Sequence, residues 1–312
     1  MQKFSGRVLD LLRTVTSRSR EGLSWPGSGR WFGFGFSLSL ILGLALSPDG
    51  LAQFRSTYSH LPSVPGRGGR QAPQQAVRTP SGVYPEYASS YGPIRWLKEQ
   101  MPLKVWVANG QAIDAILDPQ LGAPYANVDN TNGWPDLVAH ILETNKVGTL
   151  PQAEGFTPQQ RQAAIDGISM WKPFEKEGLI SYVFTDDPLE ADIHLFWVNH
   201  FVNKQGMALF SNDIRGYTAK RSFPYKAIMA GKQAAFKPVV IILRTTDKHG
   251  QPMTYSKMRA AAAHEFGHAL GIEGHSRNPG DLMNVYYGNG TISGSDAATL
   301  RYLYHQTPAL IP

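Results

Sequence analysis

The stretch from His264 to His275, with the sequence HEFGHALGIEGH, constrains the fold more than any other part of the 312-residue chain. An α-helix turns by about 400° over four residues, so His264 and His268 project from one face, about 40° apart. Two imidazoles one turn apart can bind one Zn²⁺ ion at about 2.0–2.1 Å. This spacing predicts a helix here that presents two metal ligands on the same side.

The residues between and after these two histidines fit a catalytic metal. Glu265 follows the first histidine directly, where its carboxylate can reach a water on the metal without displacing it. Gly271 can take the left-handed conformation that ends a helix and bends the chain back, and Gly274 is a second permissive point. His275 then follows as the third candidate ligand. Three protein ligands leave a fourth position for water, as in catalytic rather than structural zinc sites.

The composition limits the alternatives. The chain has no cysteine, so it has no disulfide framework and no thiolate ligand or nucleophile. A metal site must therefore use His, Asp or Glu. The net charge of +6 is divided evenly, because residues 1–52 contain six basic and three acidic residues. No dense Lys/Arg stripe is present, so we expect no nucleic acid as a partner.

The N-terminal part has the pattern of an export signal. Basic residues up to Arg30 precede an apolar run of 16 residues at 31–46, and small residues follow at Gly50 and Ala52. We expect residues 1–52 to be a signal peptide cleaved after Ala52, or else an uncleaved signal anchor. In both cases the rest of the chain is secreted or extracytoplasmic, and it touches a membrane only if the signal is retained.

Composition divides the remaining chain in two. Residues 53–94 are rich in Pro and Gly and show no apolar period, which predicts a flexible linker or a propeptide. Ordered structure is predicted to begin near Trp96, and residues 95–312 are predicted to form one catalytic domain. With 42% hydrophobic residues, the chain can build a sizeable core.

Apolar periodicity within the domain predicts an α/β (α+β) fold with a mostly parallel, twisted sheet backed by helices. Residues 109–154 are expected to be loop-rich apart from one short helix, and residues 199–235 to be loose, with weak extended character at 207–210. The helix opened by Thr157 should bury Ala164, Ile168 and Trp171 on one face. The predicted strands are 103–107, 180–184, 192–198 and 239–243, and the predicted helices are 135–143, the one from Thr157, 256–270 and 293–304.

These features resemble a known group of enzymes. HEFGHALG at 264–271 and GHS at 274–276 resemble the active-site helix and bend of the metzincin zinc proteases, in particular their matrixin-like (matrix-metalloprotease-type) branch. Asp281-Leu282-Met283 resembles the Met-turn of that family, in which the methionine (here Met283) forms a hydrophobic floor beneath the zinc. Pro102–Val105, Ala191–Ile193 and the closing helix at Leu303-Tyr304 also resemble family elements, so that the likeness spans roughly residues 95–305.

The resemblance implies a secreted zinc-dependent endopeptidase with one catalytic Zn²⁺ ion. Glu265 would act as the general base that takes a proton from water and passes it to the leaving amine. A protein or peptide substrate would lie extended along a sheet edge, which we expect at 207–210. We expect a monomer. Ca²⁺, which is common in the family, has no clear run of ligands here.

The sequence also departs from the family pattern. The third histidine comes one residue later than usual, so Gly274 stands at the usual ligand position and the bend must bulge by one residue to let His275 bind. Glu273, within the bend, is expected to be a solvated side chain. The usual Tyr-Pro after the Met-turn is replaced by a candidate specificity pocket of Asn284, Val285, Tyr286 and Tyr287.

Two other functions stay open at this point. One is a cell-surface binding protein that holds zinc without turnover, although a ligand-only site would have no need for Glu265. The other is a membrane-anchored processing protease, which would keep residues 31–46.

Overall fold

The computed structural model describes residues 80–84, 87–113, 133–201, 208, 210–211, 213–232 and 237–312. All of them belong to one compact unit, Gln74–Pro312. The other unit, Met1–Pro73, lies outside the described residues. The predicted signal at 1–52 and most of the predicted linker therefore stay predictions.

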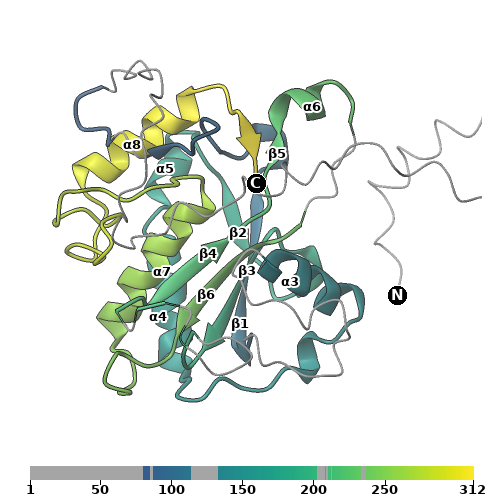
Figure 1. The fold of residues 1–312 in the computed structure, drawn as a ribbon, viewed down its shortest axis with the longest axis vertical. Helices are drawn as coiled ribbons and strands as arrows, with labels where there is room; N and C mark the ends of the chain where they lie inside the picture. The colour runs from purple at the N-terminus through teal and green to yellow at the C-terminus, as the bar shows by residue number, and fades with distance from the viewer. Residues whose placement is uncertain are drawn as a thin grey trace, which may run out of the picture. The chain divides into compact units, whose positions relative to one another are not determined.

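A five-stranded sheet with the strand order β2-β1-β3-β6-β4 forms the centre of the domain (Figure 1). The first four of these strands are parallel, and β4 runs antiparallel to β6 at one edge. Both β3 and β6 are buried along their whole length, which is typical of central parallel strands covered on both faces. The mixed α/β fold with a mostly parallel sheet is confirmed. The strands are β1 (Leu103–Ala112), β2 (Tyr182–Phe184), β3 (Ile193–Val198), β4 (Gly216–Ala219) and β6 (Val239–Arg244).

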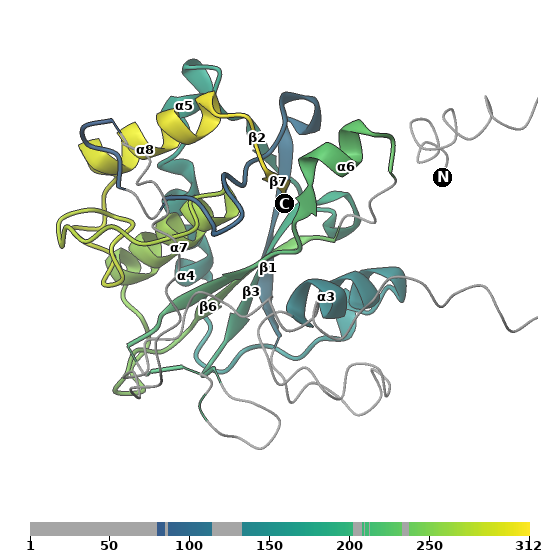
Figure 2. The same ribbon diagram turned by 45° about the horizontal axis from the view of Figure 1, so that its top comes forward.

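Helices cover both faces of this sheet. Figures 1 and 2 show α4 and α7 on one side of the sheet and α3 on the other. Capping boxes begin two of the helices: Thr157 with Gln160 begins α4, and Ser293 with Asp296 begins α8. The helices are α3 (Trp134–Glu143), α4 (Pro158–Ser169), α5 (Pro173–Lys176), α6 (Tyr225–Met229), α7 (Tyr255–Ala269) and α8 (Gly294–His305).

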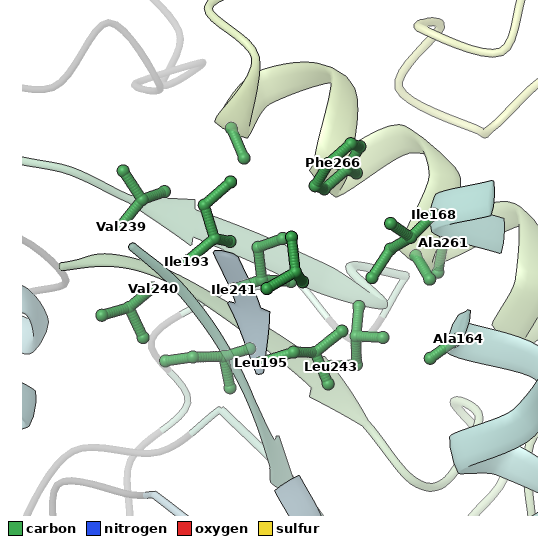
Figure 3. Close-up of a cluster of buried hydrophobic side chains, with 14 of the residues drawn as sticks. Ala164, Ile168, Ile193, Leu195, Val239, Val240, Ile241, Leu243, Ala261 and Phe266 are labelled. Atoms are coloured by element: carbon green, nitrogen blue, oxygen red, sulfur yellow. The ribbon is translucent and has the colours of Figure 1, made fainter. Parts of the chain in front are cut away.

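The core between the sheet and the helices α4 and α7 fixes the position of α7. Figure 3 shows Phe266 and Ala261 of α7 and Ile168 of α4 above Ile241 and other apolar side chains of the strands, all fully buried. The Trp171 indole, which is also buried, donates a hydrogen bond of 2.9 Å to the carbonyl of Ala263 on α7. The predicted buried face of α4 is therefore confirmed, and it holds the helix that carries the two histidines.

One sheet element was not expected. β4 lies within the segment predicted to be loose, and it is the edge strand beside β6. It has four residues, of which only the first and last are buried, so neither length nor alternation distinguishes it in the sequence. The edge predicted at 207–210 lies mostly outside the described residues. β1 also continues to Ala112, through an irregularity after Val107, into the predicted loop.

The described residues from Pro80 to Trp96 pack against the C-terminal elements of the domain, α8 and β7. Tyr84 is buried and its N–H donates to Thr299 of α8, while the Tyr87 ring packs edge-on against Tyr302. Ile94 pairs with Leu310 of β7 (Leu310–Ile311), which itself pairs with β5 (Phe223–Pro224). The C-terminal part of the predicted linker, 53–94, therefore contacts the folded domain. None of the described helices is long and apolar enough to span a membrane.

Candidate metal centre

The three predicted ligands converge at the C-terminal end of α7. Their candidate ligand atoms on His264, His268 and His275 all lie within 4.8 Å of one another, and the Nε2 atoms of the first two are 3.1 Å apart. The ring centroid of His275 lies 5.1 Å from that of His264 and 5.0 Å from that of His268. Within the described part of the chain, this is the one group of three such side chains close enough to share an ion.

Hydrogen bonds orient the two helical imidazoles. Nδ1 of His264 lies 2.7 Å from the carbonyl oxygen of Leu282, and Nδ1 of His268 lies 2.6 Å from that of Ile272. A carbonyl can only accept, so each Nδ1 carries the proton and each Nε2 lone pair is free for a metal. Burial, reinforced by His275, lowers the pKa of His264 to about 3, and burial also lowers the pKa of His268 well below 6.5. Both rings are therefore in the neutral form that binds metals.

The bend after α7 is what lets the third histidine reach the other two. Gly271 has a φ of +114°, and a Cβ at this position would collide with the carbonyl of Ile94. Only glycine satisfies both conditions. Gly274 is not among the described residues with positive φ, so the left-handed turn of this bend is at Gly271.

The expectation that Glu273 is solvated is wrong. Its carboxylate forms an ion pair with Lys220, the residue after β4, and its backbone N–H donates to the carbonyl of Tyr87 at 3.0 Å. Sequence spacing could not reveal this, because Lys220 and Tyr87 are distant in the chain.

Glu265 lies between the metal ligands and the edge strand. The side chain is buried beside Gly216, where an added Cβ would lie only 2.6 Å from Cγ of Glu265. The hydroxyl of Thr218 lies 2.8 Å from Oε2 of Glu265. Burial raises the pKa of this carboxyl to about 8, opposed by the Thr218 hydrogen bond and the charge of Lys220. This value belongs to the zinc-free site, because the positive charge of a bound Zn²⁺ ion would lower the pKa of a carboxyl beside it.

Met283 is fully buried beneath the metal-binding helix. A Cβ at Gly267 of α7 would lie 2.5 Å from its sulfur, so the methionine occupies the space directly under the turn between His264 and His268. The carboxylate of Asp296 accepts the N–H groups of Leu282 and Met283 at 2.8 and 3.1 Å. The N-terminus of α8 thus holds the turn in place, a role for Asp296 that spacing alone did not suggest.

The four residues after Met283 differ in their surroundings. Asn284 and Tyr287 are buried, whereas Val285 and Tyr286 are 40% and 72% exposed. Tyr287 has a φ of +65°, which is uncommon for a residue other than glycine. Its ring centroid lies 4.6 Å from that of His264, and its hydroxyl accepts the backbone N–H of Arg215 at 3.1 Å. Tyr287 therefore joins the Met-turn to the start of β4.

The fold and this site define a metzincin-type zinc peptidase: a mostly parallel sheet, an active-site helix with two histidines, a glycine bend and a buried methionine turn. Comparison with known families agrees. Residues 153–305 match the family model of the matrixins (Peptidase_M10), and this part of the chain is a matrixin-like metalloprotease domain. No curated protein matches the chain.

The matched region contains the whole histidine cluster, and matrixins use a catalytic zinc ion. The residues fit that ion. Zn²⁺ accepts imidazole nitrogen, and His264, His268 and His275 offer three such donors, two of them with Nδ1 held by carbonyls. The chain is accordingly a zinc metalloendopeptidase that hydrolyses peptide bonds of protein or peptide substrates. Proteins of this family are typically secreted or extracellular.

Proposed function

We propose that this chain is an extracytoplasmic endopeptidase in which His264, His268 and His275 hold the zinc ion and Glu265 is the general base. The observation that supports this most directly is the position of Glu265. Its carboxylate is next in sequence to the first ligand, is buried, and is held against β4 by Thr218. A site that only stored zinc would have no use for a buried carboxylate at this point, since burying it costs free energy.

The chemistry follows from these groups. Zinc, when bound, would polarise the scissile carbonyl and acidify the attacking water. The Glu265 carboxylate takes the proton of that water and gives it to the leaving amine, so the same carboxyl group serves as base and then as acid. The hydrogen bond from Thr218 limits the rotation of this carboxylate.

β4 is the proposed place of the substrate. It pairs with β6 on one side and is the last strand of the described sheet on the other. A peptide that added along β4 would pass beside Gly216 and Thr218, the two residues that contact Glu265. The scissile bond would then lie next to the general base. The edge expected at 207–210 lies mostly outside the described residues and stays a prediction.

The segment Asn284–Tyr287 is proposed to shape substrate specificity. Tyr287 would form a fixed wall, because its hydroxyl is held by Arg215 and its ring packs on His264. Val285 and Tyr286 are exposed and would contact the substrate itself. Replacing Tyr286 by Ala should therefore change the preference among peptide substrates while leaving bound zinc unchanged.

The decisive experiment measures zinc content and cleavage of an unfolded protein substrate, with and without chelator. Glu265→Ala should retain about one equivalent of zinc and lose activity by several orders of magnitude. Turnover by this variant equal to that of the wild type would exclude Glu265 as the base.

The ligand set has its own control. His275→Ala should bind zinc more weakly than the wild type. His305→Ala should not, because His305 lies on the exposed end of α8 with its ring against the carbonyl of Arg301. If both variants hold zinc equally, His275 is not a ligand.

Export is proposed from the sequence of residues 1–52 and from the usual location of matrixins. The N-terminal sequence of the mature protein tests it: cleavage after Ala52 would place Gln53 first. Recovery of residues 31–46 in the membrane fraction would instead indicate the anchored processing protease.

A further inference from the structure

Glu273 lies between Gly271 and His275, in the stretch of three residues that makes the bend of this chain one residue longer than the family spacing. It is held at two points: its backbone N–H donates to Tyr87, and its carboxylate pairs with Lys220. The side chain of Glu273 is 25% exposed and that of Lys220 is 10% exposed. The longer bend is therefore fixed to two other segments of the chain, one of which is the end of the edge strand β4.

Lys220 makes a second contact, to a proposed metal ligand itself. Its ammonium group donates a hydrogen bond of 2.7 Å to the backbone carbonyl of His268, in the last turn of α7. A cation is favoured there, because the carbonyls at the C-terminal end of a helix carry partial negative charge.

The next two carbonyls of the same helix end are capped differently. Trp96 donates to the carbonyl of Ala269 at 2.8 Å, and Tyr304 donates to that of Leu270 at 2.9 Å. Both donors are neutral groups. Among these three caps, Lys220 alone is charged and also binds the bend that carries His275.

We propose that Lys220 is a positioning residue of the metal centre, which binds both the carbonyl of His268 and the carboxylate of Glu273 and so sets the distance between the second and third ligands. This inference rests on the proposed function, since it takes His268 and His275 as ligands. An ion pair on an open surface contributes little, because water screens it and two long side chains must be ordered. Lys220 differs from such a pair in being largely buried and in having two acceptors.

The same ammonium also connects the site to the proposed substrate strand. Lys220 directly follows Ala219, the last residue of β4. A peptide that pairs with β4 would therefore bind to a strand whose end is joined to both sides of the metal centre. For this reason the lysine is expected to affect kcat more than KM once zinc is saturating.

The test compares Lys220→Met, Lys220→Arg and Glu273→Gln in the full-length protein. The zinc dissociation constant is measured by competition with a chelator, and the Co²⁺-substituted protein is examined by absorption spectroscopy. We expect Lys220→Met to raise the zinc dissociation constant about tenfold or more, as loss of a group that orients a ligand does, and to change the cobalt spectrum. Lys220→Arg, which keeps the charge, should recover most of the affinity.

Two control variants separate positioning from general stabilisation. Lys248→Met is the same substitution in an exposed ion pair with Asp213, where both side chains are more than half exposed. Tyr304→Phe removes the neighbouring cap on Leu270 without touching Glu273. Both should leave the zinc dissociation constant within about twofold of the wild type, even if Tyr304→Phe lowers the melting temperature.

A zinc dissociation constant for Lys220→Met within about twofold of the wild type, with an unchanged cobalt spectrum, would overturn the inference and leave the proposed function intact. If Lys220→Met does not fold, the zinc dissociation constant of Glu273→Gln is the test. A value equal to that of the wild type overturns the inference, and a higher value supports it. A wild-type protein that binds no zinc would overturn both the inference and the proposed function.

Discussion

The hydroxyl of Thr218 lies 2.8 Å from the carboxylate of Glu265 and 2.9 Å from the backbone carbonyl of the same residue. One hydroxyl has one proton, so it can donate to only one of these two acceptors at a time. When Glu265 is ionised, the proton can serve the carboxylate. When Glu265 is protonated, the acid can donate to Thr218, which then donates to the carbonyl. The edge strand can therefore accommodate both protonation states that a general base must pass through.

Thr218→Val removes this donor and acceptor while keeping the shape of the side chain. We expect kcat to fall about tenfold or more with zinc content unchanged, because the carboxylate loses its orientation and one compensating hydrogen bond. Thr218→Ser keeps the hydroxyl and should retain most of the activity. Steady-state kinetics on a peptide substrate would check this, and equal kcat for the Val and Ser variants would contradict it.

Gly216→Ala tests the close approach of β4 to the general base. The new Cβ would lie 2.6 Å from Cγ of Glu265 and 2.8 Å from Cδ2 of Leu243, so the carboxylate or the strand must move. A displacement of this size lowers kcat by on the order of 100-fold when the group takes part in the reaction. Gly148→Ala is the matched control, because no atom lies within 4 Å of its added Cβ. Activity within about threefold for both variants would count against Glu265 as the base.

The zinc-free protein should lose stability in acid because of its buried histidines. Burial lowers the pKa of His264 from 6.5 to about 3 in the folded state. The unfolded chain binds a proton at His264 below pH 6.5, whereas the folded chain does not. The contribution of His264 to the unfolding free energy is therefore fully present above pH 6.5 and is lost as the pH falls toward 3. The slope is at most about 1.4 kcal/mol per pH unit for this group. Urea unfolding of chelator-treated protein at several pH values between 4 and 7 would measure this change in unfolding free energy.

Glu265 has the opposite dependence in the same zinc-free protein. Burial raises its pKa from 4.5 to about 8, so the folded state keeps a proton that the unfolded chain releases. Stability from this group is present below pH 4.5 and is lost as the pH rises to 8. Glu265→Gln removes this loss and should be more stable than the wild type by on the order of 4 kcal/mol at pH 8, with a smaller difference at pH 5. Parallel stability curves for the two proteins would contradict this assignment.

Truncation tests where the folded domain begins. A chain that starts at Pro80 keeps Tyr84, Tyr87 and Ile94, and it should match the full-length protein in melting temperature and zinc affinity. A chain that starts at Trp96 loses these three buried side chains and the hydrogen bond from Glu273 to Tyr87. It should lose about 3 kcal/mol or more of unfolding free energy and bind zinc more weakly. Equal behaviour of the two truncated chains would place the start of the domain at residue 95, as composition suggested.

Local spacing accounts for what the sequence could predict. The placement of His264 and His268 on one face depends only on the helical repeat, and the capping boxes at Thr157 and Ser293 depend on residues three apart. The strands at 193–198 and 239–244 were visible because fully buried strands are continuous apolar runs. The matrixin resemblance rested on the same short stretches, and the family comparison confirms it.

The sequence by itself determined which residues are available for a metal and a base, but it left the surroundings of these residues undecided. Whether a bend with one extra residue could bring His275 to the other two histidines was settled by the packing of Gly271 against Ile94 and by the two contacts of Glu273. The roles of Gly216, Thr218 and Lys220 depend on an edge strand of only four residues. Such contacts join segments about 50 or more residues apart, and their energies come from burial and hydrogen-bond geometry that no local pattern records. Only the tertiary structure could decide them.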